Sequence, residues 1–124
     1  MQRSPVAGGI YFVADEHITF GDEYDPHPDG RRFVVLSAAM FNGEQDWSLV
    51  LGCPLSSSTT SRTRLCVKLG AGESGCVKKS WIRVPALQPI AKRRLGDLSG
   101  TLTPQKLSET QTRVAQYVGL VGEG

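Results

Sequence analysis

The chain has 124 residues, of which 40% are hydrophobic and 21% charged, and its formal net charge is +2. This length fits one folded domain, here taken as residues 1–124, and the composition excludes an intrinsically disordered chain. No segment approaches the roughly 20 apolar residues needed to span a bilayer, and the first five residues lack the features of a signal peptide. We therefore expect a cytoplasmic protein without membrane contact, basic enough to allow nucleic-acid binding but not to indicate it.

The first two apolar runs are rich in β-branched and aromatic residues, as buried strands are. The first run predicts a strand at about residues 8–14, in which alternation should bury one of Tyr11 and Phe12 and expose the other. A loop at 15–31 follows, without periodicity, and loops this long in compact domains are often functional. The second strand is predicted at 32–37, followed by one helical turn at 38–42.

Four more strands are predicted at residues 48–55, 64–69, 76–84 and 98–102, separated by hydroxyl-rich or glycine-rich turns. A helix at about 104–118 should follow, with Thr103 as its N-cap and Pro104 in its first position. Together these elements predict a mostly β fold, a small SH3-like barrel of five to six short antiparallel strands with a C-terminal α-helix. The apolar stripe of the helix is expected to contain Leu107, Val114, Val118 and Val121, with Gln111 completing the register.

The cysteines are three in number, Cys53, Cys66 and Cys76, and no two of them form a CxxC pair. This spacing argues against a zinc site or a disulfide framework, and we expect buried, reduced thiols. The sequence also contains no HxH, HExxH or DxD cluster. We therefore expect neither a metal nor another cofactor.

Several short motifs, taken in chain order, resemble those of the MazF/PemK (CcdB/PemK-like) toxins of type II toxin–antitoxin systems. Residues 8–13 match the family's Gly-x-Ile-Tyr/Trp-x-Val strand, and 32–37 match its Arg-Pro-Val-Val-Val-Leu-Ser segment, with Phe33 replacing the proline. Residues 40–42 match an Asn-containing turn. Further matches lie at 53–57, 75–81 and 95–104, so that the resemblance covers about residues 8–120.

This resemblance implies an SH3-like barrel, a symmetric homodimer and a cognate antitoxin that wraps the dimer. It also implies a metal-independent, sequence-selective endoribonuclease that cleaves single-stranded RNA and so inhibits translation and growth. In that chemistry the ribose 2′-OH attacks the adjacent phosphate and leaves a 2′,3′-cyclic phosphate and a 5′-OH. The reaction needs a base, a positive charge on the phosphate and a donor at the leaving oxygen.

The resemblance places three catalytic candidates. Arg32 occupies the position of the family's arginine, and a guanidinium can form two parallel hydrogen bonds to phosphate oxygens. Arg31 is the alternative if the register shifts by one residue. Ser56 takes the place of the family's threonine and keeps its hydroxyl. His27, five residues before Arg32, is the candidate base near neutral pH.

Additional residues are expected to contact RNA. Lys78 and Lys79 contribute positive charge to the C-terminal half, and Trp81 belongs either to the core or to a base-stacking surface. Some family members carry Arg-x-Asp where this chain has Arg83 followed by Pro85, so that the aspartate is missing. The expected RNA contacts are Arg31, Asp29, Ser57, Ser58, Lys78, Lys79 and Arg83.

Two other functions remain open from the sequence. One is a non-enzymatic toxin of the CcdB type, which binds DNA gyrase, and the other is a non-cleaving RNA- or protein-binding module of the same fold. Arg32 and Ser56 favour the nuclease. The replacements Phe33, Ser56 and Pro85 keep the binding module open.

Overall fold

The computed structural model describes residues 4–19, 30–59 and 62–123. Its sheet contains seven strands, and all the observed pairings are antiparallel. Two α-helices and four short 3₁₀ turns complete the structure, the first turn being η1 at Asp15–His17. The strands are β1 Gly9–Val13, β2 Arg31–Val35, β3 Leu49–Ser56, β4 Val67–Leu69, β5 Ser80–Ile82, β6 Gln88–Ala91 and β7 Leu98–Thr101, and the helices are α1 Ala39–Asn42 and α2 Pro104–Tyr117.

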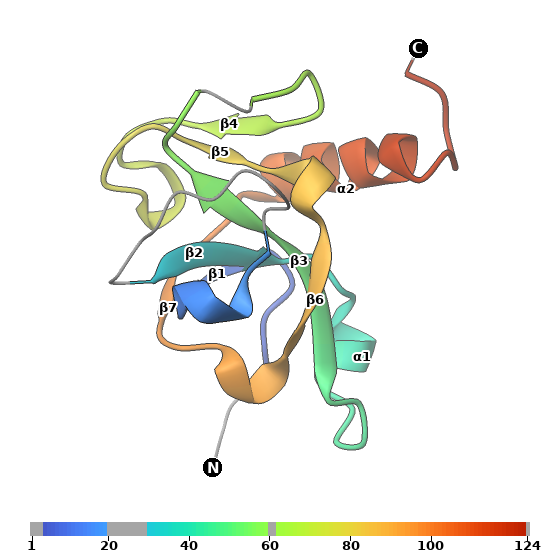
Figure 1. The fold of residues 1–124 in the computed structure, drawn as a ribbon. Helices are drawn as coiled ribbons and strands as arrows, with labels where there is room; N and C mark the ends of the chain where they lie inside the picture. Colours follow the sequence, from blue (N-terminus) through green and yellow to red (C-terminus); the bar gives the residue numbers. More distant parts are fainter. Residues whose placement is uncertain (1–3, 20–29, 60–61, 124) are drawn as a thin grey trace.

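The sheet curls into a half-barrel, with strand order β4-β5-β3-β2-β1-β7 and with β6 paired to β3 off this path (Figure 1). The predicted mostly β fold with a C-terminal helix is thus confirmed. Strand β3 pairs with β2, β5 and β6 along different parts of its length. It therefore connects both halves of the sheet.

Both faces of the curled sheet are packed, which explains why the apolar runs do not alternate with polar residues. One cluster gathers Ile10 and Val34 with Leu55 and Ile82, and the other gathers Tyr11 and Val13 with residues that include Phe33 and Ile90. As alternation predicted, Tyr11 is buried and Phe12 is exposed. The strands at the centre of the sheet thus contribute to two cores.

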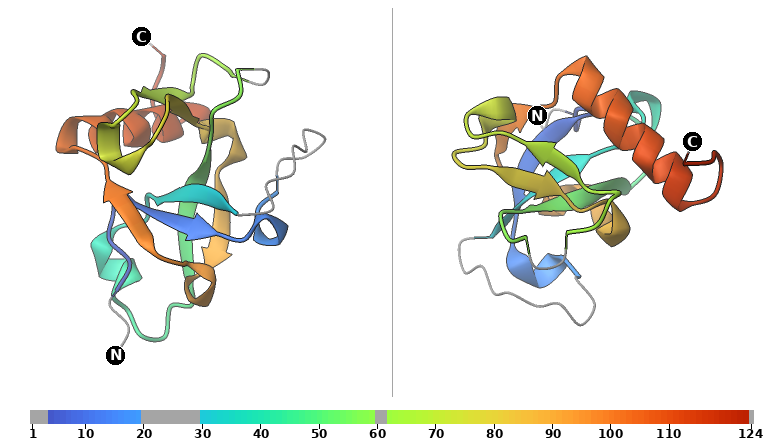
Figure 2. Two further views of the ribbon diagram at one scale, coloured as in Figure 1. Left: turned by 90° about the vertical axis from the view of Figure 1, so that its left-hand side faces the viewer. Right: turned by 90° about the horizontal axis from the view of Figure 1, so that it is seen from above.

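Helix α2 begins and ends where the sequence predicted. The Thr103 hydroxyl accepts a hydrogen bond from the backbone N–H of Lys106 (3.2 Å), and Pro104 occupies the first turn. Gly119, with φ of 82°, follows the helix in the left-handed conformation that glycine adopts readily. The helix lies along one end of the sheet and contacts β4 (Figure 2). No helix among the described residues is long and apolar enough to cross a membrane.

The predicted register of α2 was partly wrong. Leu107 and Val114 pack on the core as predicted. Between them, however, Thr110 is buried and Gln111 is exposed. Thr110 can be buried because its hydroxyl donates to the backbone carbonyl of Lys106 at 2.7 Å. Val118 and Val121 lie beyond the helix and are also exposed.

Three strands differ from the sequence prediction. Strand β6 was not predicted, because Pro89 lies within it and proline lowers strand propensity. It is tolerated because, within the described residues, β6 pairs only with β3. Strands β4 and β5 are shorter than the predicted 64–69 and 76–84, and the residues between them form a turn around η2 at Glu73–Gly75.

The β2–β3 pairing leaves no room for a side chain at Gly52. A Cβ atom added there would clash with the Val34 carbonyl oxygen and would lie 2.7 Å from the Phe33 ring. We expect Gly52→Ala to lower the free energy of unfolding by about 1–3 kcal/mol, as overpacking does. Urea unfolding would measure this, with Gly122→Ala as the control because a Cβ there would meet nothing within 4 Å. Equal stability of the two variants would contradict the close approach.

Candidate active site

Two adjacent arginines begin β2, and strand alternation sends their side chains to opposite faces of the sheet. The Arg31 side chain is 4% exposed, and its Nε donates to Asp15 Oδ1 at 2.7 Å. Asp15 lies in η1, directly after β1, so that this turn is tied to the start of β2. The charge of Arg31 is therefore balanced by a half-buried carboxylate.

Arg32 is in a different environment. Its cross-strand partner is Phe12, and its guanidinium carbon lies 5.1 Å from the centre of that ring. The buried Nε has no hydrogen-bond acceptor, and no carboxylate pairs with Arg32 among the described residues. A half-buried guanidinium with an unsatisfied donor is suited to hold an external anion.

Cys76 lies close enough to Arg32 for their charges to interact. Burial raises the pKa of the Cys76 thiol, while the positive charge of Arg32 and a hydrogen bond with Ser80 act in the opposite direction. Phe12 and Cys76 are therefore neighbours of Arg32, and Ser80 is a hydrogen-bond partner of Cys76.

Ser56 ends β3 at the same edge of the sheet at which β2 begins. It is buried, its Oγ accepts a hydrogen bond from the Ser58 backbone N–H (3.1 Å), and its cross-strand partner is Trp81. The β2–β3 register pairs Phe33 with Pro54, and continuing it by two residues puts Ser56 across from Arg31. Ser56 and Arg32 thus lie at one sheet edge but point to opposite faces.

The other predicted residues are spread over this region. Ser57 is exposed and Ser58 is half-buried in the loop after β3, while Lys78 and Lys79 are exposed before β5. Arg83 is buried, and its backbone N–H donates to the Pro54 carbonyl at 2.9 Å. The predicted residues His27 and Asp29 lie outside the described residues.

Of the two places expected for Trp81, the core or a base-stacking surface, the structure shows the core, since Trp81 is only 5% exposed. The Lys79 ammonium lies 5.8 Å from the centre of its ring, and the guanidinium of Arg62 lies 5.4 Å from it. Sequence reasoning did not find Arg62, because it follows a serine- and threonine-rich stretch without periodicity. The contact of Phe12 with Arg32 was not predicted, because the sequence indicated only that Phe12 and Tyr11 point to opposite faces of the strand.

The three cysteines differ in burial. Cys53 and Cys76 are buried as expected, but Cys66 is half-exposed. Burial, with a smaller contribution from Cys66, raises the pKa of the Cys53 thiol to about 12. We expect iodoacetamide at pH 8 to alkylate Cys66 first in the folded protein, because reactivity follows exposure and thiolate content. Peptide mass spectrometry would measure this, and prior labelling of Cys53 would contradict the buried position.

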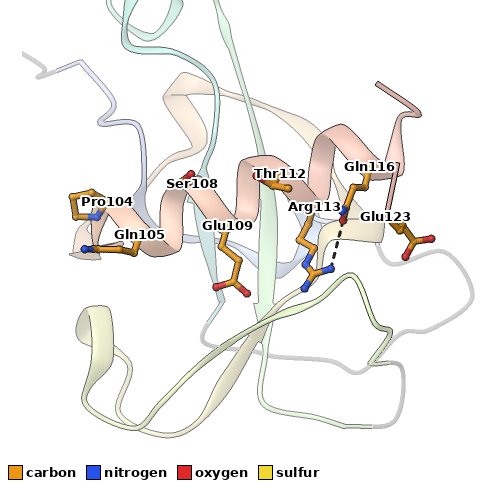
Figure 3. Close-up of a pocket in the computed structure, with 8 residues that line it drawn as sticks. All are labelled: Pro104, Gln105, Ser108, Glu109, Thr112, Arg113, Gln116 and Glu123. Carbon is orange, nitrogen blue, oxygen red and sulfur yellow. Dashed lines mark hydrogen bonds between the residues drawn. The ribbon is translucent and has the colours of Figure 1, made fainter. Parts of the chain in front are cut away.

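A shallow groove runs along the exposed side of α2 and contains none of the predicted site residues (Figure 3). Its lining is polar and charged, and it includes Glu109, Arg113 and Glu123. Glu123 forms two hydrogen bonds with the guanidinium of Arg64, at 2.7 and 2.8 Å, which joins the C-terminal segment to the loop before β4. The groove is thus separate from the arginines of β2.

The half-barrel with a C-terminal helix defines a small, mostly β protein with an arginine-based candidate site at the start of β2. A family model described as "PemK-like, MazF-like toxin of type II toxin-antitoxin system" matches residues 7–118. The chain therefore belongs to the PemK-like, MazF-like toxin family. No curated protein matches the sequence significantly.

Solved structures show the same fold. MazF (Form-I) from Deinococcus radiodurans is 19% identical, with a TM-score of 0.70 over 95% of this chain and 99% of that one. An endoribonuclease from a mycobacterial species is 19% identical, with a TM-score of 0.69 over 96% and 95% of the two chains. A mycobacterial endoribonuclease solved with its cognate antitoxin is 18% identical, with a TM-score of 0.68 over 95% and 96%.

Proposed function

We propose that this chain is the toxin of a toxin–antitoxin pair and acts in the cytoplasm as a sequence-selective endoribonuclease on single-stranded RNA. Family membership over residues 7–118 supports the toxin assignment. The similar folds of a mycobacterial endoribonuclease and of one solved in complex with its cognate antitoxin support the activity and the partner. By the same resemblance, the active form is a homodimer and a cognate antitoxin inhibits it.

The observation that carries the catalytic proposal is the unsatisfied Nε of Arg32, whose guanidinium forms no ion pair within the described part of the chain. Of the two arginines that begin β2, Arg31 is already paired with Asp15, so Arg32 is the one available to a phosphate. Two parallel N–H donors on the non-bridging oxygens would stabilise the charge that develops as the 2′ oxygen attacks. We therefore assign phosphate binding to Arg32 rather than to Arg31.

Ser56 can act on the same phosphate from the other side. Because β2 begins where β3 ends, a phosphate at this sheet edge lies between Arg32 on one face and Ser56 on the other. The Ser56 hydroxyl already accepts from the Ser58 N–H, which leaves its proton free to donate to a phosphate oxygen.

The proposed reaction is a transphosphorylation that needs no metal. His27 takes the proton of the ribose 2′-OH, the 2′ oxygen forms a bond to phosphorus, and the bond from phosphorus to the 5′ oxygen breaks. The 5′ oxygen takes a proton from water and His27 returns its proton to solvent, giving a 2′,3′-cyclic phosphate and a 5′-OH. His27 enters here on the family resemblance alone.

The test is cleavage of mixed-sequence single-stranded RNA by the purified protein in EDTA, with analysis of the product ends. We expect cutting that resists EDTA and leaves 5′-OH ends and 2′,3′-cyclic phosphates. Cutting that stops in EDTA would contradict the metal-independent mechanism. No cutting by folded protein would favour the gyrase-binding or the RNA- or protein-binding alternative.

A further inference from the structure

A row of three side chains crosses the outer face of the β4-β5-β3 part of the sheet. Lys68 is the cross-strand partner of Trp81, and Trp81 is the partner of Ser56. Partners in a ladder point to the same face. The neighbouring residues Leu55 and Ile82 point the other way, into the core. The row therefore lies on the face opposite that core and ends at Ser56, with Lys68 exposed and with Trp81 and Ser56 buried.

Positive charge gathers around the middle of this row. The guanidinium of Arg62 and the ammonium of Lys79 both lie within 6 Å of the centre of the Trp81 ring, in the range of cation–π contacts. Lys68 adds a third exposed cation on the neighbouring strand. Two loops and one strand thus bring three cations to one face.

These cations lack the acidic partners that surface cations commonly have. Within the described residues, no carboxylate forms an ion pair with Arg62, Lys68 or Lys79. Arg64, only two residues after Arg62, forms two hydrogen bonds with Glu123. Because like charges held together repel one another, a cluster of this kind is stabilised by an anion from outside.

We propose that Arg62, Lys68 and Lys79 form a phosphate-binding track around Trp81, which holds the RNA backbone on one side of the scissile phosphate. This inference deepens the proposed function and rests on it. The cation–π contacts orient Arg62 and Lys79, and the Trp81–Ser56 pairing connects the track to the cleavage site. Since the contacts are to phosphates, the track adds affinity without reading bases.

The experiment measures binding separately from cleavage. A mixed-sequence 2′-O-methyl RNA of about 15 nucleotides has no 2′-OH to attack, so that fluorescence anisotropy can record its affinity for the full chain at several salt concentrations. The logarithm of the affinity falls linearly with the logarithm of the salt concentration. Each lost phosphate contact should make this slope less steep by about 0.7 for single-stranded RNA. The variants are Arg62→Ala, Lys79→Ala and the pair combined. Arg64→Ala, in the same loop and with the same loss of charge, is the control.

We expect the salt dependence of the affinity to become less steep by about 0.7 in each single variant and by about 1.4 in the double variant. The slope of Arg64→Ala should stay close to that of the wild type. Reductions in Arg62→Ala and Lys79→Ala no larger than that of Arg64→Ala would overturn the track, as would a wild-type protein that does not bind this RNA. Binding with the expected slopes by a protein that cuts no RNA would support the track while removing the proposed nuclease activity.

Discussion

Arg32→Ala is expected to lower the single-turnover rate of RNA cleavage by about 10²–10³-fold, the loss typical when a donor to a developing oxyanion is removed. The guanidinium of Arg32 has an unsatisfied Nε and no carboxylate partner within the described structure, so its charge is available to the phosphate. Its removal also relieves a buried donor, so we do not expect a large loss of stability.

Arg32→Lys separates charge from geometry. Lysine keeps the positive charge but cannot form two parallel hydrogen bonds to a phosphate. We therefore expect a rate between those of Arg32→Ala and the wild type. Quenched-flow cleavage of one labelled RNA, at saturating enzyme, would measure all three rates. Arg94→Ala, an exposed arginine of the turn after β6, is the control. Full activity of Arg32→Ala would contradict the assigned role.

Asp15→Ala is expected to lower the free energy of unfolding by about 3–5 kcal/mol, the loss typical when one partner of a buried ion pair is removed. The side chains of Asp15 and Arg31 are 13% and 4% exposed, and their hydrogen bond measures 2.7 Å. In the variant, the positive charge of Arg31 would stay buried but would lose its hydrogen bond with this carboxylate.

The double variant Asp15→Ala with Arg31→Met tests the cause of that loss. Because it removes both charges, we expect it to be more stable than Asp15→Ala alone. Urea unfolding of the wild type, both single variants and the double variant would give the coupling energy. Additive effects of the two substitutions would mean a coupling energy of zero and would show that the interaction of Asp15 with Arg31 does not stabilise the fold.

The positions of most strands along the chain were predictable from the sequence because apolar runs and turn residues mark them strongly. The start of α2 was predictable for a similar local reason, since the Thr103 side chain caps the first turn and Pro104 fits its first position. Thr110 was not predictable as the buried position, because its hydroxyl is satisfied only once the helix has formed. Strand β6 was missed because its pairing with β3 outweighs the low strand propensity of Pro89.

Part of the candidate site could be predicted and part could not. The family motif identified Arg32, but the sequence could not distinguish it from Arg31, since neighbouring residues look alike without their partners. The structure distinguishes them through Asp15, 16 residues before Arg31 in the chain. The association of Arg62 with Trp81 could not be predicted either, because it depends on how the loop after β3 packs against β5.

The pairing of β1 with β7 has a consequence for synthesis of the protein. The first strand of the chain is completed by the last, since Gly9 pairs with Thr101. A contact this distant in the chain forms slowly and cannot form on the ribosome until the residues of β7 have emerged. A product of translation that stops before β7 would lack this closing strand. The ribosome that makes a ribonuclease of this fold is therefore exposed to its activity only after β7 has been synthesised.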